Sequence, residues 1–287
     1  DFIEEVGRLY GLHNIASVAP AEVATTAINP RQYYSEAVRQ ALLALGFSEV
    51  ITSSFHKKGK LQLQNALASD KSYVRGNLSK NLHQVLDQNY VHTDLLGMPD
   101  VRVFEIGTVF TKTDDGIGEH LGLALGVRRK GTGYTPKDDE ILEAAKAAVA
   151  EVLGYDQADW QHAQGVAEMN LDAVLTTVTP PTAYEPVTFR PAVQFAPISP
   201  YPAISRDIAM WVTPETDVLS AEQLINEAAG PLRVRTTHVD SFEKDGRTSL
   251  AFRLVFQSNQ KTLTDSEVNA IMEDIYAAVA KAGWEVR

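Results

Sequence analysis

The residue types that most often carry chemistry do not form a familiar catalytic pattern in this chain. It has no cysteine, which excludes thiolate catalysis, disulfides and cysteine-ligated zinc. It also contains no Walker loop, no G-x-S-x-G elbow and no H-E-x-x-H pair. The seven histidines show no metal-ligand spacing, so we interpret them as surface or capping residues: His13, His56, His83, His92, His120, His162 and His238.

Two glycine-containing segments need a separate interpretation. Gly131-Thr-Gly133 follows Arg128, Arg129 and Lys130, and it is either a phosphate cradle or a solvated hairpin tip. A lone G-x-G carries little information, and we favour the hairpin tip. The Asp114-Asp115 pair stands beside glycines and indicates a turn. The residues alone therefore predict no active site.

Composition describes an ordinary globular chain. Its 287 residues favour two domains, with 44% hydrophobic and 22% charged residues. A transmembrane helix needs about 18 successive apolar residues, and none is present. The net charge of −11 disfavours gripping nucleic acid by bulk electrostatics, but it leaves a local contact open. Asp1 follows no initiator methionine or signal peptide, so we expect a cytoplasmic piece of something longer.

Hydrophobic periodicity in the middle of the chain predicts helices alternating with strands. We expect helices along Tyr34, Val38, Ala41 and Leu45 (ended by Gly46), over residues 78–96, and along Ile141, Ala145, Ala148 and Val152 (ended by Gly154). We expect strands over 49–55, 101–110 and 120–127. Successive strands predict an antiparallel sheet with flanking helices, an α+β fold.

One expected strand has a face almost without side chains. Gly122, Ala124 and Gly126 alternate with larger residues, so we expect another element to pack closely against that face. Further along, seven of the 13 prolines lie close together, which predicts an extended connector between about residues 180 and 203: Pro180, Pro181, Pro186, Pro191, Pro197, Pro200 and Pro202.

The last 90 or so residues predict a ferredoxin-like βαββαβ unit. Strands are expected along Ile208 to Val212, over 233–242 and along Leu250 to Phe256, with a turn at Lys244-Asp-Gly246 and a final strand over 284–287. Helices are expected over 220–230 and from the capping box Thr264-Asp-Ser-Glu267, the latter with Val268, Ile271, Ile275, Val279 and Ala282 inward.

Three sets of segments, in order along the whole chain, carry a family resemblance. The first is Asp1 to Ile15; the second comprises Gly46 to Ile51, Asn77 to Asn89 and Val101 to Gly107; the third comprises Tyr201 to Ile208 and Gln260 to Val268. Together they resemble the C-terminal part of the bacterial phenylalanine–tRNA ligase beta subunit. The resemblance implies three parts: the tail of a DNA-binding-like domain (1–18), a class II synthetase-like core (19–196) and a ferredoxin-fold anticodon-binding domain (197–287).

The resemblance also implies a division of labour. In this family the alpha subunit performs ATP-dependent phenylalanine activation and transfer, in a heterotetramer of two alpha and two beta subunits, and tRNA(Phe) is the RNA partner. A class II site needs positioned arginines to stabilise phosphate charge. Here Gly122 to Arg128 is the segment most similar to the glycine-rich, arginine-containing motif of a class II site, but the spacing of its residues differs from that motif. Arg102 is more easily interpreted as an ion-pair partner. We therefore expect a non-catalytic platform that docks the alpha subunit, without a membrane partner.

Two kinds of site residue follow from the resemblance. By position, Asp1, Glu4 and Glu5 correspond to carboxylates of a Mg²⁺ site shared with the alpha subunit, on one helix face. Alternatively, they merely complement the helix dipole. A further ligand is expected upstream, so we expect the ion not to be bound by this chain alone.

The anticodon contact has several candidates on positions expected to face outward, namely Trp211, Arg233, Arg235, Arg253 and Lys261, together with Arg206 at the strand entry. Residues 197–287 hold 13 acidic against 9 basic groups, a poor footprint for RNA, and Arg253 could instead pair with a carboxylate. Two rival functions stay open: an amino-acid-sensing module with a ferredoxin-like ligand domain, and an autonomous synthetase-like enzyme, which the missing arginine motif disfavours.

Overall fold

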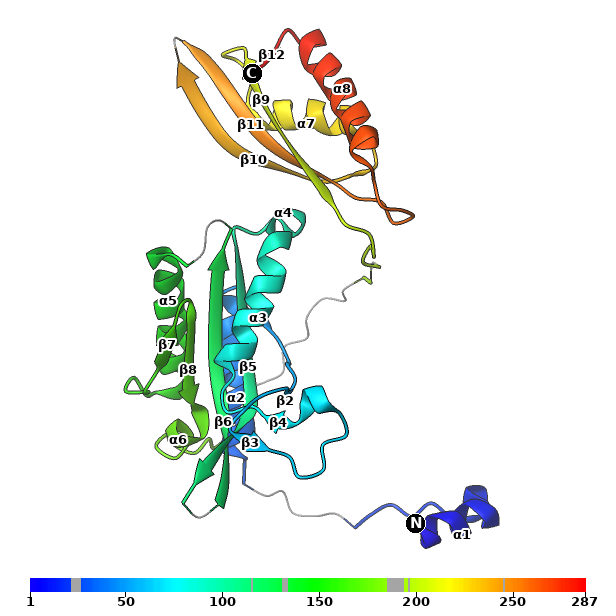
Figure 1. Ribbon diagram of the computed structural model, residues 1–287, viewed down its shortest axis with the longest axis vertical. Helices are drawn as coiled ribbons and strands as arrows, with labels where there is room; N and C mark the ends of the chain where they lie inside the picture. The colour runs from blue at the N-terminus through cyan, green and yellow to red at the C-terminus, as the bar shows by residue number, and fades with distance from the viewer. Residues whose placement is uncertain (22–26, 115, 131–133, 185–193, 196, 245) are drawn as a thin grey trace.

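The computed structural model contains two sheet-based units and a separate N-terminal helix (Figure 1). It describes residues 1–287 except 22–26, 115, 131–133, 185–193, 196 and 245. Gly131-Thr-Gly133, Asp115, Asp245, Pro186 and Pro191, named above, therefore lie outside the described residues. No helix within the described ranges has the length and apolar character required to span a membrane.

The first unit is built on a five-stranded sheet in the order β1-β5-β6-β8-β7. Its strands are β1 (Ser48–Glu49), β5 (Asp100–Thr113), β6 (Gly116–Arg129), β7 (Gln161–Ala163) and β8 (Val166–Asn170). Only β1 is parallel to its neighbour, and the other pairs are antiparallel. The predicted α+β fold with an antiparallel sheet and flanking helices is confirmed.

The expected strand over residues 49–55 is wrong. It is two short pieces, β1 and β2 (Phe55–His56), and β2 belongs to a small sheet with β3 (Leu61–Gln62) and β4 (Tyr73–Val74) in the order β2-β4-β3. Between the pieces, the Thr52 amide donates to the Glu105 carboxylate at 3.2 Å instead of joining a ladder. The Thr52 amide, which a continuous strand would use for a ladder hydrogen bond, is thus bonded to the buried Glu105 side chain.

One face of the main sheet is covered by α3 (Ser79–Asn89), as the small-residue face predicted (Figure 1). A Cβ on Gly126 would lie 3.1 Å from Leu86 Cδ1, and one on Gly122 would lie 3.3 Å from Leu78 Cδ1. The predicted helix over 78–96 is interrupted, because a 3₁₀ turn (Tyr90–His92) separates α3 from α4 (Thr93–Leu96). Gly97 ends α4 at φ 66°.

The other face is covered by α2 (Pro30–Ala44), α5 (Pro136–Leu153) and α6 (Leu171–Leu175). The buried stripe of α5 is Leu142, Ala145, Val149 and Leu153, not the predicted Ile141, Ala145, Ala148 and Val152. A capping box between Thr135 and buried Asp138 defines the start of the helix, and packing against α2 and the sheet selects the face that is buried.

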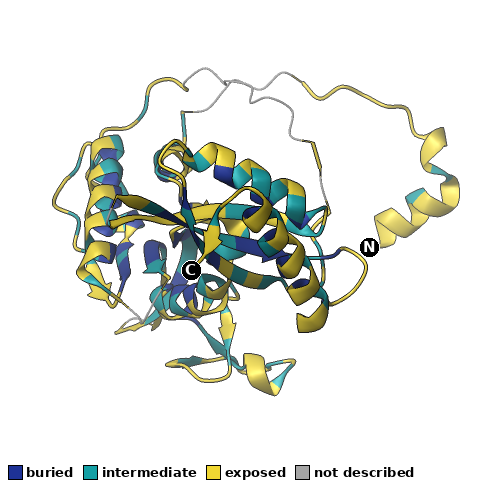
Figure 2. Ribbon diagram, turned by 90° about the horizontal axis from the view of Figure 1, so that it is seen from above, coloured by how far each residue is buried: buried dark blue, intermediate teal, exposed yellow. Residues whose placement is uncertain are grey.

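The C-terminal unit has the predicted βαββαβ order. Its elements are β9 (Ile204–Val212), α7 (Val218–Ala229), β10 (Arg233–Lys244), β11 (Arg247–Phe256), α8 (Asp265–Lys281) and β12 (Glu285–Val286), and the sheet order is β10-β11-β9-β12. The Thr264–Glu267 capping box opens α8, with Met272 rather than Ile271 buried. Figure 2 shows buried residues inside both units, whereas α1 (Phe2–Tyr10) is almost wholly exposed.

Candidate nucleic-acid interface

The open face of the four-stranded sheet is the first candidate interface. Alternation along β9 and β11 turns Met210 and Phe252 into the core beneath α7 and α8, so the intervening residues line the opposite face. The register places Trp211 beside Ser249 and Ser249 beside Phe242, in one row across β9, β11 and β10. An open sheet face with aromatic groups can stack RNA bases.

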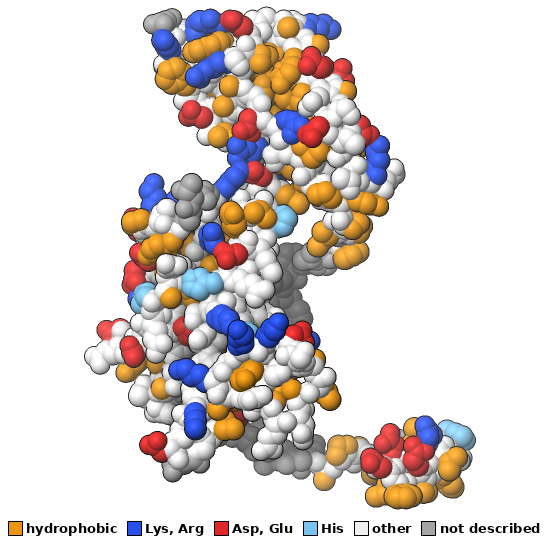
Figure 3. All heavy atoms as spheres, viewed as in Figure 1, with side chains coloured by type: hydrophobic (Ala, Val, Ile, Leu, Met, Phe, Trp, Pro, Cys, Tyr) orange, Lys and Arg blue, Asp and Glu red, His pale blue; other side chains and the backbone are white. Residues whose placement is uncertain are grey.

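Trp211 and Phe242 form an aromatic pair flanked by cations. Their ring centroids lie 6.4 Å apart. The Arg247 guanidinium lies 5.0 Å from the Trp211 ring centroid, and the Arg287 guanidinium lies 5.9 Å from Trp211 and 5.6 Å from Phe242. Figure 3 shows hydrophobic and basic side chains intermixed around this end of the C-terminal unit. We call these four residues the aromatic platform, and it combines stacking surfaces with positive charge.

Sequence reasoning named Trp211 but missed the other three members of the platform. Phe242 and Arg247 flank the predicted turn, and their strand alternation could have placed them on the Trp211 face. Arg287 could not be placed that way, because its position depends on β12 pairing with β9, where the Arg287 amide donates to the Ala209 carbonyl at 2.8 Å. Arg247 is also held by Glu285, at 2.6 Å.

Three of the six predicted RNA contacts lie away from the open face. Arg206 pairs with Asp265 of α8, and Lys261 pairs with Glu267 at the start of the same helix. Hydrogen bonds from Lys261 and Thr264 lower the pKa of Glu267 to about 2. The third residue, Arg233, lies 3.5 Å from the hydroxyl of Thr236, which bonds Asn226 of α7 on the helix side. These three side chains therefore do not share the sheet face of Trp211, and their contact with RNA stays a prediction.

Arg235 and Arg253 lie on the same sheet face as Trp211, but at the end of the sheet that contacts the first unit. Arg253 binds Asp207 through two hydrogen bonds of 2.7 and 2.6 Å, and it reaches Asp94 of α4 at 3.2 Å. Arg235 Nε donates to the Leu95 carbonyl at 2.9 Å. Lys130 of the first unit also pairs with Asp94. Arg253 thus has a carboxylate partner within its own sheet, as expected. Arg235 and Arg253 together connect the C-terminal unit to α4 of the first unit.

Asp94 supports this contact electrostatically. Burial raises the pKa of its carboxyl, but hydrogen bonds from Lys130 and Arg253 outweigh that effect and hold the pKa below its ordinary value of 3.8. Because the folded pKa is depressed, the contribution of Asp94 is present above pH 3.8 and is lost as the pH falls through the lower folded value. The contact is therefore fully formed at neutral pH.

Replacing Asp94 with asparagine should loosen the two units at neutral pH. A partly exposed ion pair contributes about 1 kcal/mol or less. The ratio of molecules with the two units in contact to molecules with the units apart should therefore fall by up to about fivefold. Small-angle scattering should show a larger radius of gyration than in the parent chain. Asp87→Asn is the matched control, since Asp87 pairs with Arg128 inside the first unit. Equal scattering from Asp94→Asn and Asp87→Asn would contradict the role of Asp94.

The three predicted metal ligands lie at the exposed start of α1. Asp1 is the N-cap residue, Glu4 and Glu5 are in the first turn, and Glu5 pairs with Arg8. Across the described part of the chain, no group of three His, Asp or Glu side chains is placed to hold a metal ion. The assignment of these carboxylates to a shared Mg²⁺ site stays a prediction, and their position also suits the alternative role of complementing the helix dipole.

The first unit holds a buried polar network that sequence reasoning missed. Arg75 and Glu105 form an ion pair of 2.6 Å, with side chains 5% and 2% exposed. Arg75 Nε also donates to the Thr108 carbonyl at 2.8 Å, and the Thr52 hydroxyl donates to Glu105 at 2.7 Å. A Cβ on Gly107 would lie 2.3 Å from Arg75, so this glycine makes room for the guanidinium. Every one of these charges has an internal partner.

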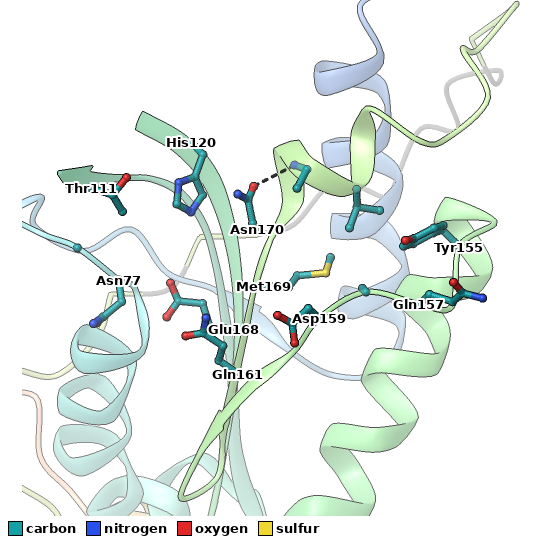
Figure 4. Close-up of a pocket in the computed structure, with 14 residues that line it drawn as sticks. Asn77, Thr111, His120, Tyr155, Gln157, Asp159, Gln161, Glu168, Met169 and Asn170 are labelled. Carbon is teal, nitrogen blue, oxygen red and sulfur yellow. Dashed lines mark hydrogen bonds between the residues drawn. The ribbon is translucent and has the colours of Figure 1, made fainter. Parts of the chain in front are cut away.

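A polar pocket of about 450 Å³ lies beside this network, between β6, β8 and the start of α3. Figure 4 shows Asn77, His120 and Glu168 around one part of it, with Asp159 and Tyr155 elsewhere along the wall. Glu168 is already engaged, because its carboxylate accepts the amides of Leu78 and Ser79 at 2.9 and 2.8 Å. The described lining contains neither lysine nor arginine, so it offers no cationic group for nucleotide phosphates.

Both units match models of known protein families. Residues 199–287 match the ferredoxin-fold anticodon binding domain. Residues 15–170, more than half of the chain, match the phenylalanyl tRNA synthetase beta chain CLM domain. The chain therefore belongs to the phenylalanyl-tRNA synthetase beta chain family.

Similar curated proteins carry the same name. A phenylalanine–tRNA ligase beta subunit from Synechococcus sp. (strain JA-3-3Ab) is 26% identical over 98% of this chain and 40% of its own length. Another from Moorella thermoacetica is 27% identical over 97% of this chain and 41% of its own. The chain thus spans about two fifths of these relatives. A putative aspartyl-tRNA synthetase structure from Leishmania major Friedlin is similar over 46% of this chain and 27% of its own, at 16% identity and TM-score 0.31.

Proposed function

We propose that this chain is the part of a phenylalanine–tRNA ligase beta subunit that binds the tRNA(Phe) anticodon and docks the catalytic alpha subunit. The observation that carries the RNA role is the aromatic platform on the open face of the matched anticodon-binding unit. Bases can stack on Trp211 and Phe242 while Arg247 and Arg287 contact phosphates. RNA contacts by Arg206, Arg233, Arg235, Arg253 and Lys261 are secondary, because none of these five side chains belongs to the aromatic platform.

The chain itself performs no chemistry in this proposal. Activation of phenylalanine with ATP and its transfer to tRNA belong to the alpha subunit, in a cytoplasmic heterotetramer of two alpha and two beta subunits. The internally paired Arg75–Glu105 network supports a structural role for the first unit. Mg²⁺ binding at Asp1, Glu4 and Glu5 would need ligands from outside this chain. The proposed parts are 1–18, 19–196 and 197–287.

Titration with an anticodon stem-loop of tRNA(Phe) tests the RNA role. We expect binding that weakens as salt rises, and weaker binding when the three anticodon bases are changed while the stem is kept. Equal affinity for both loops would contradict anticodon recognition. Co-purification with the alpha subunit, followed by phenylalanine acceptance on tRNA, tests docking: we expect a stable complex, with aminoacylation only when the alpha subunit is present.

A further inference from the structure

A second, basic cavity of about 530 Å³ lies between the small sheet, the first turn of α3 and the end of β5. Four lysines contribute to its lining, namely Lys58, Lys60, Lys80 and Lys112. No carboxylate is among the described residues that line it. In a chain with a net charge of −11, this cavity has the opposite sign to the molecule as a whole. Figure 3 shows Lys and Arg side chains gathered over this part of the first unit.

The local structure brings these lysines together from separate segments. Lys58 and Lys60 flank Gly59 in the connection between β2 and β3, Lys80 is in the first turn of α3, and Lys112 is near the end of β5. A Cβ on Gly59 would lie 2.9 Å from Tyr73 Cβ, so a glycine is required for this connection to pass so close to β4. That close passage sets the position of the two lysines beside Gly59.

The four lysines are available to a ligand. All four are exposed, and none forms an ion pair within the described structure, whereas Lys130, Lys146 and Lys261 do. His56 also lines the cavity, and burial together with the charges of Lys80 and Arg75 lowers the pKa of its imidazole. Unpaired cations that share a concave surface repel one another, and an anion relieves that repulsion.

The chemistry of the cavity favours a chain of phosphodiester groups over a single bound phosphate or nucleotide. A nucleotide cradle uses free amides at a helix N-terminus, but Leu78 and Ser79 donate theirs to Glu168, and Lys80 donates its amide to Asn77 at 3.2 Å. Only flexible ammonium groups remain, and these contact phosphates as point charges. Protein–protein interfaces are depleted in lysine, so an acidic protein surface fits less well.

We propose that this cavity is a second RNA-contacting site, which binds the phosphodiester backbone of RNA. It lies in the first unit, whereas the aromatic platform lies in the C-terminal unit. The choice of RNA as the source of phosphate rests on the proposed function. The position and charge of the cavity are observed independently of that function. Binding there is independent of base sequence, because lysines contact phosphates rather than base edges.

The test is a salt titration of the full chain with a fluorescent, single-stranded RNA of mixed sequence. The variant Lys58→Gln with Lys80→Gln removes two exposed charges from the cavity. Removing two phosphate contacts should reduce the slope of log K against log salt by about 1.4 and weaken binding by about 10- to 30-fold near 0.1 M salt. The matched control is Lys137→Gln with Lys281→Gln, which removes two exposed lysines that do not line the cavity and should change the slope little.

Each outcome decides the proposal. A loss specific to the cavity variant supports it, and an equal loss in both variants, or none in either, overturns it. Pyrophosphate or polyglutamate that binds through Lys58 and Lys80 while RNA affinity stays unchanged would also overturn the assignment to RNA. Trp211→Ala measured in parallel separates the two sites: if only that variant weakens binding, this inference fails and the proposed anticodon contact stands.

Discussion

Replacing Arg75 with methionine is expected to lower the free energy of unfolding of the first unit by about 3–5 kcal/mol. The substitution leaves Glu105, whose side chain is 2% exposed, as a buried carboxylate without its cationic partner. The hydroxyl and amide of Thr52 remain as its donors, and they cannot neutralise the charge. Urea unfolding followed by hydrogen exchange of the β5 and β6 amides measures the loss in this unit separately from the C-terminal unit.

Two further variants make this prediction specific. Arg39→Met breaks an ion pair with Glu49 in the same unit, but both side chains are 31% exposed, so the loss should not exceed about 1 kcal/mol. The double variant Arg75→Met with Glu105→Leu should recover much of the stability, because it leaves no lone buried charge. If Arg75→Met proved no more harmful than Arg39→Met, the buried pair would not have the role assigned to it.

Replacing Trp211 with alanine is expected to weaken binding of the tRNA(Phe) anticodon stem-loop by about 5- to 150-fold. Stacking of one base on an aromatic side chain contributes about 1–3 kcal/mol. Trp211 is central to the platform, since it contacts Phe242, Arg247 and Arg287. Fluorescence anisotropy with a labelled stem-loop, at a fixed salt concentration, measures the change.

The controls separate stacking from a general loss of structure. Trp211→Phe retains an aromatic ring and should keep most of the affinity. Trp160→Ala removes a partly exposed tryptophan from the first unit, where Lys146 lies 5.9 Å from its ring centroid, and should leave stem-loop binding unchanged. Loss of affinity in Trp211→Phe as large as in Trp211→Ala would indicate a role for the indole itself, and unchanged affinity in both would remove Trp211 from the interface.

The C-terminal unit could be predicted well because its signals are local. Alternation from Leu250 to Phe256 determines which side chains of β11 enter the core, and a strand repeats every two residues. The capping box at Thr264 and Glu267 marks the start of α8 within four residues. The small-residue face of β6 likewise predicted a close neighbour, although it could not say that α3 is that neighbour.

Local signals failed where distant groups compete for the same atoms. Residues 49–55 have the composition of a strand, but the Thr52 amide bonds a carboxylate 53 residues away. The stripe of α5 was displaced because several of its faces are apolar, so composition alone does not select the buried one. Packing against α2 and the sheet makes that choice.

The sequence by itself determined the family, the α+β class and the βαββαβ order, because these follow from motifs and from periodicities of two and 3.6 residues. Tertiary structure alone decided which cations are available. Arg253 and Arg235 are bound to α4, 159 and 140 residues away along the chain, while Lys58 and Lys80 remain unpaired around a cavity. A charge finds its partner through space, and the fold sets which charges come within reach of one another.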